Sequence, residues 1–289
     1  PAQGLTPQRL AALLRDAENG NAMRYLEMAE EMEERDLHYM AVLGTRKRQV
    51  SQLEITVEPA SDSAEDQANA DLVSAFLDRD EMEDELVDVM DAVGKGFSAT
   101  EIIWDVSERQ WMPQRLEWRM PQWFEFDRND GHTLLLRGET GALEPLAPWK
   151  FIRHVHKAKS GLPIRGGFAR AVAWWYVFKN YAVKDWVTFV EIYGQPLRVG
   201  KYGPDATVED KRALLRALAN IGSDAAAMIP QSMMIEFIKD SSGSQTADIY
   251  QALCTYIDLL ISKAVLGQTT TTDAVSGGHA VSKEHNEVR

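Results

Sequence analysis

The chain has 289 residues, of which 45% are hydrophobic, and its formal net charge is −13 at pH 7. This length and apolar content are enough for one large or two ordinary folded domains, which argues against a disordered chain. The charge is concentrated between Asp62 and Asp91, where twelve acidic residues accompany one basic residue, Arg79, so this segment disfavours nucleic-acid binding and is expected to form a solvated helix face.

The first predicted elements are helices. Thr6 followed by Pro7 is typical of an N-cap and a first helical position, and predicts a short helix over residues 9–16. Residues 21–50 place methionine and leucine side chains among charged ones at roughly helical spacing. This pattern predicts one longer helix.

Strands are predicted after these helices. Residues 52–59 alternate with a period of two and end at a proline, which is typical of a strand, and residues 61–91 then return to helix. Beyond Gly94, β-branched and aromatic runs separated by turn residues predict short antiparallel strands. These are expected over residues 98–106, 110–118, 124–126, 133–137 and 151–156. The first half is therefore predicted to be α+β, with no fixed-period repeat.

The most distinctive predicted element is an aromatic-rich helix over residues 167–193. Gly194 supplies a left-handed residue and Pro196 lacks an N–H group, so the helix is expected to end near Tyr193. At 1.5 Å per residue, it would be about 40 Å long. Its apolar residues occupy more than one face, which fits either a strut in an assembly or a central helix buried in a large monomeric core. Periodicity does not separate these two possibilities.

A small β-α-β unit is predicted next. Residues 197–201 form a short strand, and the sequence from Thr207 to Asp210 resembles a capping box that opens a helix ending at Asn220. Short extended runs follow over residues 226–229 and 233–238.

A second long helix is predicted over residues 244–266, where Gly267 closes it. Residues 268–278 are rich in threonine and glycine and cannot bury a core, so a polar, mobile loop is expected there. Two long helices thus bracket the small unit.

The sequence offers little support for a catalytic or cofactor site. It contains no phosphate-binding loop and no dinucleotide fingerprint. His154 and His156 could share one face of a strand and chelate a metal, but no third ligand is placed, and an exposed strand explains both. Cys254 falls within an apolar helix pattern, which favours a core position over a reactive thiol. No cofactor and no metal are therefore expected, although a site assembled by folding stays open.

The cysteine content and the hydropathy pattern indicate in which cellular compartment the chain is used. A single cysteine excludes an intrachain disulfide and fits a reducing environment. Arg170, Lys179 and Lys184 interrupt the longest apolar run, so no bilayer crossing is expected, and no secretory signal is present. The chain is expected to be made and used in the cytoplasm.

Five short blocks carry a family resemblance. They are WWYVFK at residues 174–179, KDW at 184–186, EIYGQP at 191–196, VGKY at 199–202 and ISKAVLGQT at 261–269. Each block is weak by itself, but in this order and spacing they resemble the portal proteins of Mu-like tailed bacteriophages. The likeness covers most of the chain and is weakest in the first twenty residues.

The resemblance implies a portal-like α+β fold with an α/β wing, two long stem helices and a small β-α-β clip. The implied parts are a wing over residues 1–168, a first stem helix over 169–194, a clip over 195–242, a second stem helix over 243–266, and a tunnel loop with the start of the return to the wing over 267–289. Portal proteins usually continue through a further wing segment and a helical crown. The chain is therefore expected to be a fragment.

The implied function is a non-enzymatic conduit. Portal proteins form a homo-oligomeric ring, usually a dodecamer, at one capsid vertex, through which double-stranded DNA is packaged and later ejected. The implied partners are the terminase motor, head-completion or neck proteins, capsid and scaffold proteins, and the passing DNA, with no membrane. The implied location is the virion, after assembly in the host cytoplasm. An acidic chain with few cationic clamps suits DNA that must slide.

The resemblance also implies three sets of contact residues. The loop facing DNA is expected to comprise Gln268, Thr269, Thr270, Thr271, Thr272, Asp273 and Ser276. The subunit interface of the stem is expected to comprise Trp174, Phe178, Trp186, Phe189, Tyr250 and Ile257. The partner contacts of the clip are expected to comprise Lys201, Tyr202, Lys211, Arg212 and Arg216.

Two other functions stay open on the residues alone. A soluble α+β enzyme would show a cleft with convergent carboxylates, or His154 and His156 bound to a metal. A structural adaptor that binds only protein would form no central hole. Two long helices beside a small unit and a polar loop favour the conduit.

Overall fold

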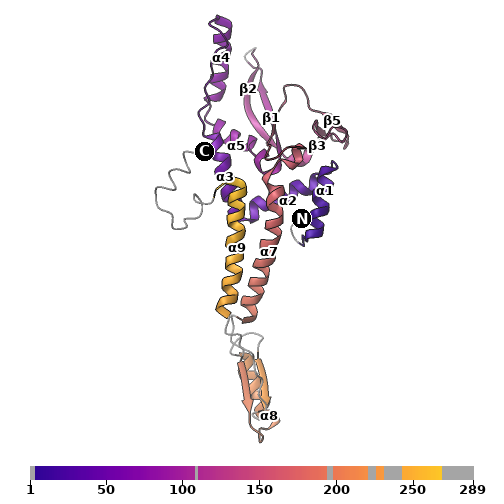
Figure 1. Cartoon of the computed structure of the whole chain (residues 1–289), viewed down its shortest axis with the longest axis vertical. Coiled ribbons are helices and arrows are strands. Elements are labelled where there is room, and N and C mark those ends of the chain that lie inside the picture. Colours follow the sequence, from indigo (N-terminus) through magenta and orange to yellow (C-terminus); the bar gives the residue numbers. More distant parts are fainter. Residues whose placement is uncertain (1–3, 108–109, 194–197, 221–225, 231–242, 269–289) are drawn as a thin grey trace. The chain divides into compact units, whose positions relative to one another are not determined.

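The computed structural model describes residues 4–107, 110–193, 198–220, 226–230 and 243–268. The chain divides into two compact units, one of residues Pro1–Val177 with Ile257–Arg289 and the other of Phe178–Tyr256. The chain passes between the units within its two long helices, α7 (Phe168–Tyr193) and α9 (Gly243–Leu266), shown in Figure 1. Each unit is therefore described by itself.

The first unit begins with helices. They are α1 (Pro7–Glu18), α2 (Met23–Arg35), α3 (Leu37–Ser51), α4 (Ala64–Leu77), α5 (Met82–Val89) and α6 (Ala92–Lys95). The predicted N-cap at Thr6 is confirmed, because its side chain accepts a hydrogen bond from the Arg9 N–H. The single helix predicted over residues 21–50 is wrong, since Asp36 ends α2 and caps α3 by accepting from the N–H groups of His38 and Tyr39.

Two other predictions for this region need correction. Residues 52–59 form no strand: none of the described strands pairs with them, and Leu53 and Ile55 are exposed. An alternating pattern therefore did not suffice, because a strand exists only through pairing. The helix predicted over residues 61–91 is interrupted between α4 and α5. No residue of α4 is buried, which agrees with the expected solvated face.

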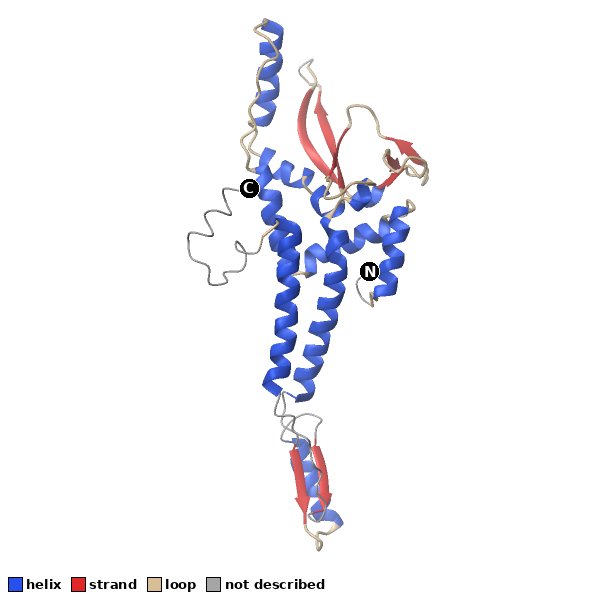
Figure 2. Cartoon of the chain, in the orientation of Figure 1, coloured by secondary structure: helices blue, strands red, loops and turns tan. Residues whose placement is uncertain are grey.

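Two three-stranded antiparallel sheets complete this unit. The first has the order β2 (Met112–Arg119), β1 (Phe97–Asp105) and β6 (Phe151–Val155), and the second has the order β3 (Phe124–Phe126), β4 (Leu134–Arg137) and β5 (Leu143–Pro145). The predicted pairing of β1 with β2 is confirmed, with a bulge between Ile103 and Trp104. Strand β5 was not predicted. The mixture of helix and sheet agrees with the α+β prediction (Figure 2).

The core of the first unit is built around α2 and α3. Tyr25, Met28 and Tyr39 are completely buried there. The first turns of α7 and the last turns of α9 enter the same core: Ala169, Ala173, Ile257, Ile261 and Val265 are each 0% exposed. The Arg46 side chain of α3 also donates a hydrogen bond of 2.7 Å to the Val265 carbonyl. These contacts fix the two ends of the long helices that belong to this unit.

A buried ionic cluster joins α2, α3, α6 and β2. The Lys95 ammonium lies 2.7 and 2.8 Å from the two carboxylate oxygens of Asp91. Lys47 donates to Glu33 at 3.1 Å and to Asp91 at 3.3 Å. The Trp118 indole N–H also donates to Asp91, at 3.0 Å. Asp91 therefore holds three donors inside the unit.

The start of α7 approaches the turn after α6 without room for a side chain. A Cβ added at Gly167 would lie 2.3 Å from the Gly94 carbonyl oxygen and 2.4 Å from the Gly96 nitrogen. These are backbone atoms, which cannot move aside as the end of a flexible side chain can. Glycine at this position therefore sets how closely α7 packs on α6.

We expect Gly167→Ala to lower the free energy of unfolding by about 3 kcal/mol, because overpacking against fixed backbone forces the elements apart. Urea titration followed by tryptophan fluorescence measures the change. Gly44→Ala in α3 is the control, since its added Cβ would meet only the end of the Arg48 side chain, at 3.2 Å or more. Equal stability of the two variants would contradict the expectation.

The second unit contains a parallel β-α-β module. Strand β7 (Arg198–Tyr202) pairs in parallel with β8 (Ala226–Pro230), and α8 (Val208–Asn220) connects them. The predicted capping box is confirmed: Thr207 N–H donates to the Asp210 carboxylate at 3.0 Å, and Asp210 N–H donates to the Thr207 hydroxyl at 3.2 Å. The extended run predicted over residues 233–238 lies outside the described residues.

The expectation of no bilayer crossing considered the apolar run around α7 and overlooked a segment of helix α9. Among the described residues, Asp248–Leu266 is long and apolar enough by length and composition, with a mean hydropathy of 1.3. A core helix passes the same test, so this is a weak indication. Ile257, Ile261 and Val265 are completely buried in the first unit, and packing therefore accounts for the hydropathy of that half. The predicted closure at Gly267 is confirmed by its φ of +74°.

Candidate functional site

The second unit contains parts of α7 and α9 that run antiparallel and side by side (Figure 1). Tyr250 of α9 forms the contact between them. Its ring stacks on Trp186 with centroids 6.5 Å apart and planes 10° apart, and it lies 6.2 Å from the ring of Phe189. We call residues 178–193 of α7 and 243–256 of α9 the helix pair. Its largest aromatic side chains are used within the chain.

A different set of apolar residues remains on the surface of α7. Val183, Val187 and Val190 are 41%, 53% and 52% exposed. Their spacing of four and three residues places them in one row along the helix. A shallow hollow of about 240 Å³ lies over this row, lined by Trp186, Val187, Val190 and Glu191. We call the three valines the α7 stripe.

Helix α9 carries an apolar row with the same spacing. Ile249, Leu253 and Tyr256 are 66%, 42% and 55% exposed. Side chains separated by four and then three residues again line one side of a helix. We call these three residues the α9 stripe. Large apolar side chains gathered in a row on a surface are typical of an interaction site.

Helical geometry places the two stripes on opposite faces of the helix pair. An α-helix turns about 100° per residue. On α7, Trp186 and Phe189 face α9. Measured about the axis of α7 from that direction, the α7 stripe lies about 100° away, in the sense in which the helix turns as residue number increases. From the direction of Tyr250, which faces α7, the α9 stripe is rotated by about 90° in the direction of decreasing number.

Because the helices are antiparallel, these two rotations have the same sense when the pair is viewed from one end. They start from directions that point at each other, so they end on opposite faces. Such stripes cannot meet within one chain. The α7 stripe of one copy can pack against the α9 stripe of the next, which is a heterologous contact that closes into a ring when the rotation allows.

The residues predicted for the stem interface lie in several environments. Ile257 is completely buried and Trp174 is half-buried in the first unit, and their part in a subunit interface stays a prediction. Trp186, Phe189 and Tyr250 contact one another across the helix pair. Of the predicted set, Phe178 is exposed, at 43%.

Sequence reasoning missed both stripes. Their row spacing was visible in the sequence, but the aromatic residues of the same helices gave the stronger signal. Valine, isoleucine and leucine occur in every core, so their exposure became apparent only with the contacts of the helix pair known.

The residues predicted for clip contacts lie on the β-α-β module. Lys201 and Arg212 are exposed, and the Lys211 ammonium lies 4.5 Å from the centroid of the Tyr202 ring. The Arg216 side chain donates to the Arg212 carbonyl at 3.3 Å. Strand β7 and helix α8 thus bring the set together on one small module, and its partners stay a prediction.

Of the predicted loop facing DNA, Gln268 is described and is half-buried at the end of α9. Residues 269–276, including Thr269, Thr270, Thr271, Thr272, Asp273 and Ser276, lie outside the described residues. The helix stop expected at Gly194 and Pro196 also lies outside them.

The two histidines considered as metal ligands have other surroundings. His154 Nδ1 lies 2.9 Å from the Val89 carbonyl oxygen, and the His156 ring packs 5.2 Å from the Phe168 ring. Burial, followed by the charges of Arg46 and His154, lowers the pKa of His156. Within the described part of the chain, no group of three His, Cys, Asp or Glu side chains could hold a metal ion. Cys254 is half-buried and forms no disulfide.

Comparison with known proteins gives matches over nearly the whole chain. The family model described as "Portal protein of Mu bacteriophage" matches residues 26–289. The chain is 36% identical over 295 residues to "Mu-like prophage FluMu protein gp29" of Haemophilus influenzae, with 100% of this chain and 56% of that protein covered. It is 36% identical over 292 residues to "Portal protein" of Escherichia phage Mu, with 100% and 57% covered. The chain thus spans somewhat more than half the length of these relatives.

Proposed function

The chain belongs to the portal protein family of Mu bacteriophage, and we propose that it forms the ring at a capsid vertex through which double-stranded DNA enters and leaves the virion. The observation that carries this proposal is the pair of apolar stripes on opposite faces of the helix pair. A chain with two different, complementary faces joins head to tail with its copies, and a ring is the closed result.

The proposal assigns a part of the ring to each segment. Residues 1–168 form the wing, and the helices over 169–194 and 243–266 form the stem. The β-α-β module within 195–242 forms the clip, and residues 267–289 contain the tunnel loop. The module supports this assignment, because its exposed side chains carry both signs of charge, with Lys201, Arg212 and Arg216 beside Asp205, Glu209 and Asp210. Such a surface suits charge-complementary contact with a partner protein.

The proposed partners follow from the role of a portal. They are further copies of the chain in a dodecamer, the terminase motor and later the head-completion or neck proteins at the clip, capsid and scaffold proteins around the wing, and DNA within the channel. The ring is proposed to assemble in the host cytoplasm and to stay in the virion. A net charge of −13 supports a channel that holds DNA weakly, since cationic contacts to phosphates would retain it.

The proposed role is structural rather than enzymatic. The enzyme alternative required convergent carboxylates in a cleft or a metal on His154 and His156. The His154 ring instead contacts a backbone carbonyl, and the best-paired carboxylate, Asp91, is buried among Lys95, Lys47 and Trp118. A catalytic site would need these groups exposed to substrate. The His154 ring and the Asp91 carboxylate instead contact other groups of the fold and stabilise it.

Mass measurement tests the ring. In mass photometry and negative-stain images, the purified protein should form annular particles whose mass is a multiple of 32.5 kDa. The images should show a central hole wide enough for a DNA duplex. Compact monomers at every protein concentration would overturn the proposal, and a closed particle without a hole would favour the protein-binding adaptor.

A further inference from the structure

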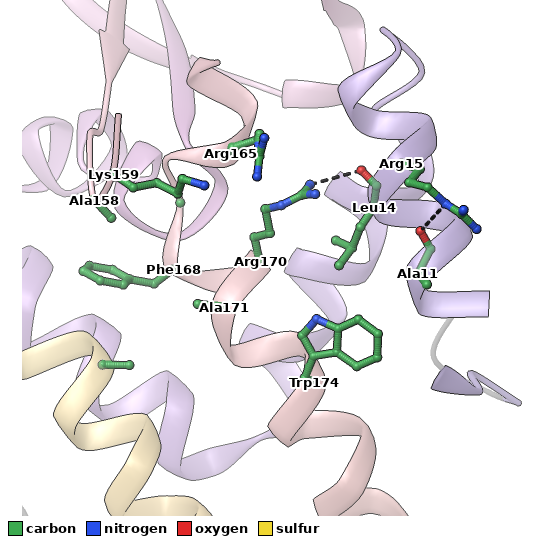
Figure 3. Close-up of a pocket in the computed structure, with 12 residues that line it drawn as sticks. Ala11, Leu14, Arg15, Ala158, Lys159, Arg165, Phe168, Arg170, Ala171 and Trp174 are labelled. Atoms are coloured by element: carbon green, nitrogen blue, oxygen red, sulfur yellow. Dashed lines mark hydrogen bonds between the residues drawn. The ribbon is translucent and has the colours of Figure 1, made fainter. Parts of the chain in front are cut away.

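A cationic pocket lies on the first unit. It has a volume of about 710 Å³ and is formed by α1, residues 158 and 159, the 3-10 turn Pro163–Arg165, the start of α7 and Ala264 of α9 (Figure 3). Leu14, Phe168, Ala171 and Trp174 give it an apolar floor. Its charged lining residues are all basic: Arg15, Lys159, Arg165 and Arg170.

The positive charge of this pocket is only partly compensated. Glu18 is the one carboxylate that pairs with these cations in the described part of the chain, and its Oε1 atom contacts both Arg165, at 3.3 Å, and Arg170. The Arg165 atom of this ion pair is the buried Nε, and its contact with Glu18 does not have the geometry of a hydrogen bond. Four cations with one carboxylate leave a net charge of +3 in a chain whose total is −13.

Helix α4 carries uncompensated charge of the opposite sign. None of its residues is buried, and Glu65, Asp71 and Asp78 at its ends and middle are exposed. Asp71 and the C-cap residue Asp78 are seven residues apart, which places both on the same face of the helix. Among the described residues, no cation pairs with any of these three carboxylates. Val73, 47% exposed, adds an apolar side chain to the same helix.

The two features lie on opposite flanks of the first unit. Figure 1 shows α4 and α1 far apart across the helices and sheets of this unit. The α4 of one chain therefore does not reach the pocket of the same chain. Two copies placed head to tail, however, bring the acidic flank of one against the basic flank of the next.

We propose that the pocket between α1 and the start of α7 binds the acidic helix α4 of a second copy of this chain. The proposal rests on the ring proposed above and adds to the helix-pair contact a second, electrostatic one between neighbouring subunits. The cations of the pocket rim receive the carboxylates of α4, and the floor at Phe168 and Trp174 receives its apolar side chains. Such complementarity selects the partner and the register more than it adds affinity.

Nucleic acid is the weaker occupant on the same observations. DNA phosphates would approach a chain of net charge −13 against long-range repulsion. A concave site with an apolar floor also fits the side chains of a peptide helix better than a charged duplex. The test below includes DNA as an outcome that would overturn the proposal.

Charge reversal tests the contact. The double variant Arg15→Glu/Lys159→Glu changes two exposed side chains of the pocket. It should weaken ring assembly at least about tenfold at low salt, equivalent to about 1.4 kcal/mol, and should reduce the salt dependence of assembly. Adding Asp71→Lys/Asp78→Lys should restore assembly. Lys157→Glu, exposed but outside the pocket, is the matched control and should assemble normally.

Cross-linking locates the contact directly. On a Cys254→Ser background, a copy with Lys159→Cys and a copy with Asp71→Cys should form a disulfide only when they are mixed. Normal rings without this cross-link and without charge-swap rescue would overturn the pocket proposal and leave the portal function standing. Absence of rings from the unmodified protein would overturn the portal function instead. Loss of short-duplex DNA binding in the Arg15→Glu/Lys159→Glu variant, with rings unchanged, would assign the pocket to nucleic acid.

Discussion

Val187→Asp should abolish ring assembly and leave the chain folded. Val187 is 53% exposed at the middle of the α7 stripe, so the folded single chain keeps the new carboxylate in water. In the ring, the same carboxylate would be buried against an apolar neighbour without a partner. An uncompensated buried charge costs about 3 to 5 kcal/mol, which weakens each subunit contact by a factor of about a hundred to several thousand.

Mass photometry of the variant should show monomers at concentrations where the unmodified protein forms rings. Leu253→Asp on the α9 stripe should have the same effect, because the contact is heterologous and needs both faces. Thr188→Asp is the control: Thr188 is exposed on α7 and lies neither three nor four residues from any valine of the α7 stripe, so the variant adds the same charge off the stripe and should still assemble. Rings from both stripe variants would contradict the proposed interface.

Trp186 and Phe189 are less suitable for this test than the sequence indicated. Both rings pack on Tyr250 within one chain, so a polar replacement removes contacts that hold the helix pair together. Loss of rings from such a variant would not separate a broken interface from a loosened subunit. The exposed valines separate the two, because they are exposed in the single chain and are used only in the proposed interface.

Asp91→Asn should lower the free energy of unfolding by about 3 kcal/mol, the low end of the cost of breaking a buried ion pair, because Glu33 still lies 3.1 Å from Lys47 and 3.8 Å from Lys95. Lys95 and Lys47 both contact Asp91, and the Trp118 N–H does so as well. Urea titration at neutral pH measures the loss. Asp84→Asn, an exposed carboxylate on α5, is the matched control and should change stability by less than about 0.5 kcal/mol.

The same cluster predicts a pH dependence with a defined sign. Burial alone would raise the pKa of Asp91, but Lys95 and Lys47 outweigh it and lower the pKa below its ordinary value of 3.8. The stabilisation from Asp91 is therefore complete above pH 3.8 and is lost as the pH falls through the lowered folded-state pKa. The stability difference between the unmodified protein and Asp91→Asn should narrow below pH 3.8.

At the alkaline end, Lys47 acts in the opposite direction. Burial lowers its pKa, but Glu33 and Asp91 outweigh burial and raise the pKa above the ordinary 10.5. Its contribution is complete below pH 10.5 and is lost as the pH rises through the raised value. The stability of the unmodified protein should therefore fall above pH 10.5 as well as below pH 3.8. If the free energy of unfolding of the unmodified protein and that of Asp91→Asn both stayed constant across the acid range, the role given to Asp91 in this cluster would be contradicted.

The sequence alone determined the features that depend on neighbours along the chain. Thr6 capped α1 as expected, Thr207 and Asp210 formed the capping box of α8, and Gly267 closed α9. Local rules suffice there, because the partners of each backbone group lie within a few residues. The order of short motifs likewise pointed to the portal family, which the family match and the relatives confirm.

Only the tertiary structure decided which surfaces each element keeps free. An alternating pattern over residues 52–59 did not make a strand, because no strand in the described part of the chain pairs with this segment. Trp186, Phe189 and Tyr250, which are predicted to lie between subunits, contact one another within the chain, and the smaller Val183, Val187 and Val190 are exposed. The cationic pocket joins residues of α1 and α7 that are more than a hundred positions apart. Burial depends on the three-dimensional neighbours of a side chain, and periodicity gives only the face on which the side chain lies.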